Sequence, residues 1–231
     1  MSERMRPPER LRRAVIADLK PVKPLRSPGR RALEVALWGV FALLVTPAVF
    51  GIRHDAALLG IMLTWGAAVI EVVAGVLVVG LALREAVPGS GIGRRRAVAA
   101  LVAGAAVQSA VALLTWMGGP PSAAAQAMSH SGAKCFAMQG MLGLPALMLT
   151  VFLVVQALPV RPPWAGALAG LGAGLLADGV WHLVCPVCTL RHLLLWHGAA
   201  TVAMVGVGFL LGVAWEHRRT RQVGALVGER R

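Results

Sequence analysis

The chain has 231 residues, of which 57% are hydrophobic and 14% are charged. It is too apolar for a soluble domain of this length, in which about half of the residues are apolar. Its formal net charge of +13 resembles that of a nucleic-acid-binding protein. The basic residues, however, flank long apolar runs, where Lys and Arg on the cytoplasmic side of a membrane are expected, so no direct nucleic-acid contact is predicted. Three cysteines are too few for a disulfide scaffold.

Residues 1–31 form a polar and basic arm. The arm contains no apolar core, so it is not a secretory signal peptide. The segment from Glu9 to Lys20 predicts a short helix, because Leu11, Val15 and Leu19 recur at every fourth residue and form one apolar stripe.

Pro21 and Pro24 are expected to end this helix. Two interpretations remain open: the helix lies on anionic lipid through its basic residues, or it binds in a groove of a partner protein. On the second interpretation, the partner-binding residues are Leu11, Val15, Leu19, Pro21, Val22, Pro24 and Leu25.

Six apolar runs of about 20 residues follow, which is the length needed to cross a bilayer. They predict an all-α, polytopic membrane protein with a bundle of six transmembrane helices. The predicted spans are Ala32–Ile52, Ala57–Leu83, Ala97–Met117, Phe136–Leu158, Trp164–Trp181 and Leu193–Trp215. We therefore expect three parts: the arm of residues 1–31, a six-helix sensor domain of residues 32–215, and a basic tail of residues 216–231.

The distribution of Lys and Arg predicts the orientation. The arm has ten, the loop Arg84–Arg96 four, the turn Pro159–Pro163 one and the tail five, whereas the opposite side has only Arg53, Lys134 and Arg191. The excess of positive charge is cytoplasmic in membrane proteins, so both termini are predicted to lie in the cytoplasm, as in a multi-pass protein of the bacterial inner membrane. The cysteines then lie on the external, oxidising side.

The fifth predicted span carries Gly166, Gly170, Gly174, Asp178 and His182, each four residues after the last. On a helix these residues form one ridge. The glycines would let a neighbouring helix approach closely. Asp178 is expected either to orient His182 as a metal ligand or only to cap and hydrate the external end of the helix.

The segment from His182 to Gly198 contains two of the three cysteines and three of the six histidines. Cys185 and Cys188 have the CxxC spacing, which suits a shared metal ion or a small disulfide. Together with Cys135 and the histidines they suit Zn(II), Cu(I) or Cd(II), bound transiently rather than as an obligatory cofactor. The alternative is a structural disulfide from Cys135 to Cys185 or Cys188.

Two further polar features accompany this segment. On a regular helix, His197 points about 140° away from His192, at 100° per residue, so the two imidazoles need not serve one site. Glu71 lies near the middle of the second span and is expected to face the inside of the bundle.

Three parts of the chain together resemble a known family. They are residues 17–28 (ADLKPVKPLRSP), Cys135 before the fourth span, and Cys185-Pro186 followed by residues 192–197 (HLLLWH). In combination they are similar to the NrsF-type negative regulators of sigma-F, which are six-span anti-sigma factors of the bacterial inner membrane.

The resemblance implies that a cytoplasmic region, most simply the arm, holds an extracytoplasmic-function sigma factor inactive. It also implies that two external cysteines take part in the response to metal or oxidative stress. The matching positions are Cys135 and Cys185, and Cys188 is additional. The sensing pair is thus either Cys135–Cys185 or Cys185–Cys188.

The resulting hypothesis is a non-enzymatic membrane anti-sigma factor that responds to a thiophilic metal or an oxidant. Its expected sensing residues are Cys135, Cys185, Cys188, His182, His192 and Asp178. The alternative is a membrane thiol oxidoreductase linked to quinone, although such a relay usually needs two cysteine pairs. A metal transporter would require ligands within the spans, whereas these thiols are expected at the membrane surface.

Overall fold

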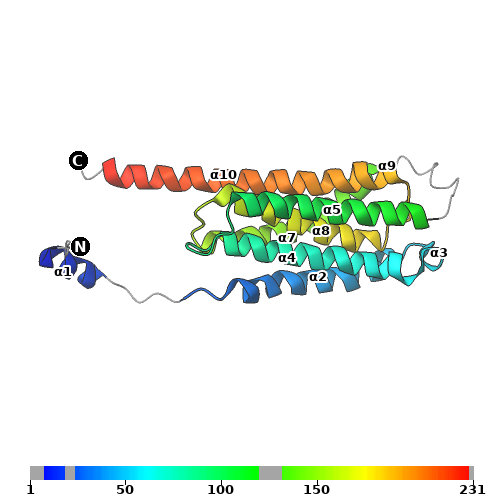
Figure 1. Cartoon of the computed structure of the whole chain (residues 1–231), viewed down its shortest axis with the longest axis horizontal. Helices are drawn as coiled ribbons and strands as arrows, with labels where there is room; N and C mark the ends of the chain where they lie inside the picture. The colour runs from blue at the N-terminus through cyan, green and yellow to red at the C-terminus, as the bar shows by residue number, and fades with distance from the viewer. Residues whose placement is uncertain (1–7, 19–23, 120–131, 229–231) are drawn as a thin grey trace.

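The computed structural model describes residues 8–18, 24–119 and 132–228 (Figure 1). Within these ranges the chain is helical and contains no strand, as the apolar runs predict. The elements are α1 (Glu9–Asp18), α2 (Pro28–Phe50), α3 (Ala56–Ile61), η1 (Met62–Gly66), α4 (Ala67–Glu85), α5 (Arg94–Gly118), α7 (Gly132–Gln156), α8 (Pro162–His182), α9 (Leu190–His192), η3 (Leu193–His197) and α10 (Gly198–Gly228). The long helices run side by side as a bundle.

Five helical segments are long and apolar enough to cross a membrane. They are Pro28–Phe50, Ala56–Glu85, Arg94–Gly118, Gly132–Gln156 and Leu190–Gln222, which correspond to five of the six predicted spans. The sixth, α8, has 21 residues, is rich in glycine and carries Asp178 and His182, and the other helices surround it. Its crossing of the membrane stays a prediction.

Two of these segments are not regular helices. Each contains a π-helical turn near the same end of the bundle, η1 in the second segment and η3 in the last. Gly60, just before η1, has a positive φ of 74° and interrupts the helix there. Because π turns are frequent at functional sites, both turns are candidates for parts of a site.

The outer surface of the bundle is apolar. Leu37 and Leu44 of α2 are each 62% exposed, and Leu77 of α4 is 65% exposed. Apolar surface of this extent is rare on soluble proteins and suits contact with lipid.

Helix α8 is the centre of the bundle. It packs against α4, α7 and α10, and every side chain from Ala165 to His182 is buried. A Cβ atom on Gly172 would lie 2.7 Å from the carbonyl oxygen of Gly75 in α4, so only glycine fits there. The predicted ridge of Gly166, Gly170 and Gly174 faces the backbone of α10 in the same way, which makes it a packing surface.

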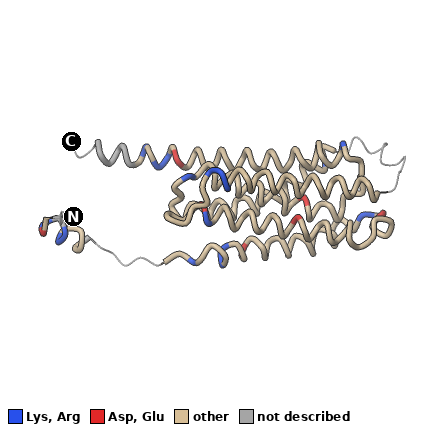
Figure 2. Tube along the Cα trace, viewed as in Figure 1, with Lys and Arg blue, Asp and Glu red and all other residues tan. Residues whose placement is uncertain are grey.

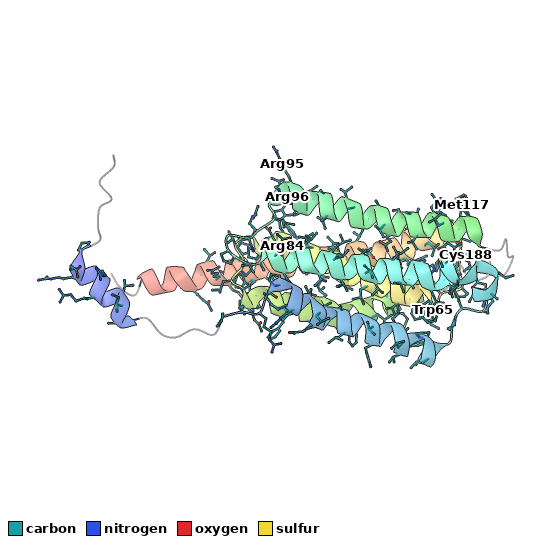
Figure 3. The ribbon with its side chains drawn as sticks, turned by 60° about the horizontal axis from the view of Figure 1, so that its bottom comes forward. Trp65, Arg84, Arg95, Arg96, Met117 and Cys188 are labelled. Atoms are coloured by element: carbon teal, nitrogen blue, oxygen red, sulfur yellow. The ribbon has the colours of Figure 1, made fainter. Side chains whose placement is uncertain are left out.

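Charge is distributed unequally between the two ends of the bundle. Most Lys and Arg residues lie at the end where α2 begins and α10 leaves the bundle (Figure 2). Arg84, Arg95 and Arg96 lie toward this end, whereas Met117 and Cys188 lie toward the opposite end (Figure 3). The basic end is the one predicted to face the cytoplasm, and this orientation stays a prediction.

Candidate functional site

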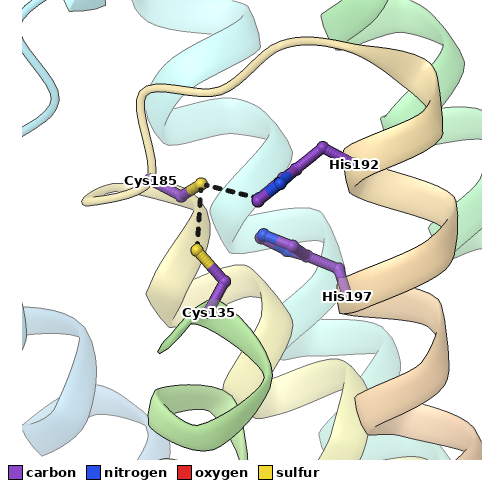
Figure 4. A group of neighbouring side chains, drawn as sticks. All are labelled: Cys135, Cys185, His192 and His197. Atoms are coloured by element: carbon purple, nitrogen blue, oxygen red, sulfur yellow. Dashed lines mark hydrogen bonds between the residues drawn. The ribbon is translucent and has the colours of Figure 1, made fainter. Parts of the chain in front are cut away.

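Four soft donor groups meet at the end of the bundle opposite the basic residues. They belong to Cys135 at the start of α7, Cys185 in the loop after α8, His192 in α9 and His197 in η3 (Figure 4). One ligand atom from each residue lies within 4.8 Å of all the others, and all four residues are buried. We refer to them as the Cys2His2 cluster.

The distances within the Cys2His2 cluster are short. The sulfurs of Cys135 and Cys185 are 3.6 Å apart, and the Cys185 sulfur lies 3.5 Å from Nε2 of His192. All three cysteines of the chain are free thiols. The contact with Cys135, together with burial, raises the pKa of the Cys185 thiol well above its ordinary value, so this thiol is protonated near neutral pH.

The π-helical turn η3 is the reason why His197 joins the cluster. The expectation that His192 and His197 point about 140° apart assumed a regular α-helix and is wrong. A π turn contains about one more residue than an α turn, so residues five apart face the same side. The two imidazole rings lie 5.4 Å apart between centroids.

Asp178 orients His197 rather than His182, which corrects the expected pairing. Its Oδ1 atom lies 2.6 Å from Nδ1 of His197, and its Oδ2 atom accepts a hydrogen bond from Gln108 of α5. Gln108 also donates to Thr201 of α10 at 3.0 Å. Asp178 is thus held by side chains of α5 and η3, and it supports a member of the cluster from behind.

His182 has a structural partner of its own. Its Nε2 atom lies 2.8 Å from the backbone carbonyl of Leu63, inside the π turn η1. The amide of Ala67 bonds to Met62 and Thr64 instead of Leu63, so η1 leaves the Leu63 carbonyl free for another donor. A carbonyl only accepts, so Nε2 of His182 carries a proton. The structure therefore does not bring His182 together with the cysteines at one site.

Cys188 belongs to a different group, which we call the Arg53 cluster: Arg53, Asp55 and Cys188. Arg53 donates to both carboxylate oxygens of Asp55, at 2.6 and 2.9 Å, and to the Cys188 sulfur at 2.8 Å. Burial raises the pKa of the Cys188 thiol, and the charge of Arg53 offsets only part of this rise. The CxxC spacing thus does not bring Cys188 to the sulfur of Cys185 in this structure, because Arg53 and Asp55 hold it elsewhere.

Glu71 faces the inside of the bundle, as predicted, and is 1% exposed. It lines a cavity of about 10 Å³ together with Gln108, Asp178, His182 and His197. A cavity of this size has room for about one water molecule. Glu71 therefore lies behind the cluster and does not contribute a ligand to it.

The arm is only partly described. Val15 and Leu25 are 53% and 50% exposed, and Pro24 is also exposed. The side chain of Leu11 and all atoms of Leu19, Pro21 and Val22 lie outside the described residues. The helix itself is confirmed from Glu9 to Asp18.

His197 was considered in the sequence analysis but left out of the expected sensing residues, and Gln108 and Arg53 were not singled out there. Gln108 lies in an apolar span, and a polar residue in such a position was a usable sign of function. Arg53 and His197 gave no comparable sign, because their roles depend on a loop contact and on a π turn.

The NrsF family model, described as the negative regulator of sigma F, matches residues 16–215. No match was found among curated proteins or among solved structures. The matched range includes the last three residues of α1, all helices from α2 to η3, the greater part of α10 and both clusters. The match covers most of the chain and confirms the resemblance, so this protein belongs to the NrsF family of negative regulators of sigma F.

Proposed function

We propose that this protein is an anti-sigma factor of the bacterial inner membrane that holds an extracytoplasmic-function sigma factor inactive through its arm. In this proposal a thiophilic metal ion or an oxidant reaches Cys135 and Cys185 from the external side. Its binding or reaction there weakens the affinity of the arm for the sigma factor. Six helices, including α8, cross the membrane, and both termini are cytoplasmic.

The observation that supports the signal input most directly is the buried pair of free thiols. Cys135 and Cys185 come from positions 50 residues apart, on different elements, and their sulfurs are 3.6 Å apart. A metal ion or a disulfide that joined them would tie α7 to the loop that follows α8. The pair also favours regulation over a quinone-linked relay, because the third thiol is held by Arg53 and Asp55.

The observation that supports the output is the exposed apolar surface of the arm. Val15 and Ile16 of α1 are 53% and 55% exposed. Two apolar side chains on a helix of ten residues suit a groove in a partner protein. The family describes that partner as a sigma factor.

The energy of such a switch sets a requirement on the signal. Reversing a two-state equilibrium from 1:99 to 99:1 needs a ligand that binds one state about 5.5 kcal/mol more tightly than the other. Thiolate–metal bonds are strong enough to supply this difference.

The test is a pull-down from detergent-solubilised membranes with identification of the retained proteins. The full-length protein is compared with a variant that lacks residues 1–26, because α2 begins at Pro28 behind its cap Ser27 and stays intact. We expect a sigma factor only with the full-length protein.

A matched pair of substitutions refines this test. Val15→Glu places a charge on the apolar stripe and should reduce sigma-factor retention about tenfold or more. A tenfold loss of affinity corresponds to about 1.4 kcal/mol, which the loss of one buried apolar contact can exceed. Ala14→Glu adds the same charge beside the stripe and should retain the partner. No sigma factor with any variant, together with cysteines that cycle against quinone, would make the protein an oxidoreductase.

A further inference from the structure

We infer that Cys135, Cys185, His192 and His197 form a tetrahedral four-ligand site for a thiophilic divalent metal ion of the Zn(II) and Cd(II) class. This inference deepens the proposed function, because it names the ligand set and the class of ion at the external thiols. It adds two histidines to the pair of cysteines and leaves Cys188 and His182 outside the site.

The spacing of the donor atoms fits tetrahedral coordination. Zinc binds thiolate sulfur at about 2.3 Å, so two sulfurs on one ion lie about 3.8 Å apart. The sulfurs of Cys135 and Cys185 are 3.6 Å apart, and Nε2 of His192 is 3.5 Å from the Cys185 sulfur. With all four ligand atoms within 4.8 Å of one another, small side-chain movements bring them onto one ion.

His197 supplies an independent argument, because one of its ring nitrogens is buried without a hydrogen-bond partner among the described residues. That atom is Nε2, and it points toward the two sulfurs (Figure 4). The other nitrogen, Nδ1, lies 2.6 Å from Asp178. An ionised carboxylate only accepts hydrogen bonds, so Nδ1 carries a proton, and Nε2 is the ring nitrogen that faces the sulfurs.

A metal ion satisfies this nitrogen in a way that the surrounding protein does not. A buried polar atom without a partner destabilises the folded state, because it has lost its hydrogen bonds to water. Histidines that bind metals almost always donate their other N–H to a carboxylate or a carbonyl. Asp178 gives His197 this arrangement, and Gln108 and Thr201 hold Asp178 and its neighbourhood in place.

The composition and enclosure of the site determine which ions it takes. Two sulfurs and two imidazoles suit Zn(II) and Cd(II) and do not suit Mg(II) or Ca(II). Trp181, Val187 and Leu142 pack around the two cysteines, so the surroundings are apolar. Four protein ligands fill a tetrahedral ion, as in structural sites, which leaves no position for a substrate.

Binding is balanced in charge and in protons. Both sulfurs bind as thiolates, so their two negative charges neutralise one divalent ion, and the protons that the ion displaces pass to solvent. The complex is therefore electrically neutral in surroundings where an unpaired charge is costly. Binding is expected to release about two protons per ion.

The experiment uses full-length protein purified in detergent, freed of metal and titrated with Co(II), whose visible spectrum distinguishes tetrahedral sulfur coordination from octahedral coordination. We expect about one Co(II) per chain with a tetrahedral thiolate spectrum, displaced by Zn(II) and Cd(II). His192→Ala, His197→Ala and Cys135→Ser should each weaken binding about 100-fold or more. Asp178→Asn should weaken it about 10- to 100-fold with an unchanged spectrum, as a residue that only positions a ligand does.

Cys188→Ser and His182→Gln are the matched controls, since they alter a neighbouring thiol and imidazole and should leave Co(II) binding unchanged. Thermal unfolding of the metal-free variants establishes whether each one is folded. Three ligand variants are tested, so the result still stands on the other two if one of them does not fold. The inference is overturned by an octahedral spectrum, by loss of binding in Cys188→Ser, or by full binding in both histidine variants. None of these readouts involves a sigma factor. If the protein binds Co(II) but no sigma factor, the metal site is supported and the proposed function is rejected.

Discussion

Asp55 shows how a single buried charge stabilises the end of the bundle that carries the cysteines. Burial alone would raise the pKa of its carboxyl group, but the hydrogen bonds and positive charge of Arg53 outweigh burial and hold the pKa below the ordinary value of 3.8. A carboxyl group with a lowered pKa in the folded state contributes stability that is complete above its ordinary pKa. This stability is lost as the pH falls through the lowered value.

We therefore expect the melting temperature of the detergent-solubilised protein to fall as the pH drops from about 5 to 3. Asp55→Asn should have a lower melting temperature at pH 7 and a flatter profile below pH 5, because it removes the titrating group. Glu9→Gln alters an exposed ion pair with Arg12 and should follow the unmodified protein. Equal profiles for Asp55→Asn and the unmodified protein would show that Asp55 has no such role.

At the scale of the element, the π turn η3 decides which side chains meet. A π turn contains one residue more than a regular turn, and removal of one residue restores the α-helix without rotating the helix beyond it. His192 and His197 would then be four residues apart, a spacing that also shares one face of an α-helix. The turn thus accommodates an extra residue while it keeps both histidines at the cluster.

We predict that deletion of Leu194, which is 46% exposed in η3, keeps the fold and the Co(II) spectrum. Deletion of Val202, 71% exposed in α10, is the control. No π turn absorbs that deletion, so it rotates the rest of α10 by about 100° against α8 and should lower the melting temperature sharply. Loss of Co(II) binding after deletion of Leu194 would mean that the π geometry itself is needed.

Much of the arrangement of elements could be predicted from the sequence. In lipid the backbone N–H and C=O groups of each apolar run need hydrogen-bond partners within the run, and a helix provides them. The sequence also indicated Cys135, Cys185 and His192. It did not indicate His197, because a π turn leaves no simple periodicity. The sequence suggested a pair of Asp178 and His182, because the two residues share one face of a helix. In the structure His182 instead donates a hydrogen bond to the backbone carbonyl of Leu63, which the π turn η1 leaves free.

At the scale of the whole molecule, α8 joins the Cys2His2 cluster and the Arg53 cluster to the rest of the bundle. It packs against α4, α7 and α10, and those helices approach it so closely that glycine is required at Gly172. Closely packed interfaces of this kind change between discrete arrangements rather than deforming gradually. A ligand that joins α7 to the loop after α8 therefore acts on several helices at once.

This coupling predicts a difference between the cysteines in living cells. Cys135→Ser should abolish the increase in sigma-factor-dependent transcription after exposure to Cd(II), as measured with a reporter gene, because it removes a ligand. Cys188→Ser should retain most of the increase, because Cys188 belongs to the Arg53 cluster. An unchanged response in Cys135→Ser would separate the Cys2His2 cluster from signalling.

All four donors of the Cys2His2 cluster are buried, at 2–6% exposure, so an ion enters or leaves only when the surrounding loop opens. The rate of that opening limits exchange, whatever the affinity. A regulator that binds metal as proposed would respond to the history of exposure rather than to the momentary concentration of metal. Transcription that depends on the sigma factor would then continue for some time after the metal has been removed from the surroundings of the cell.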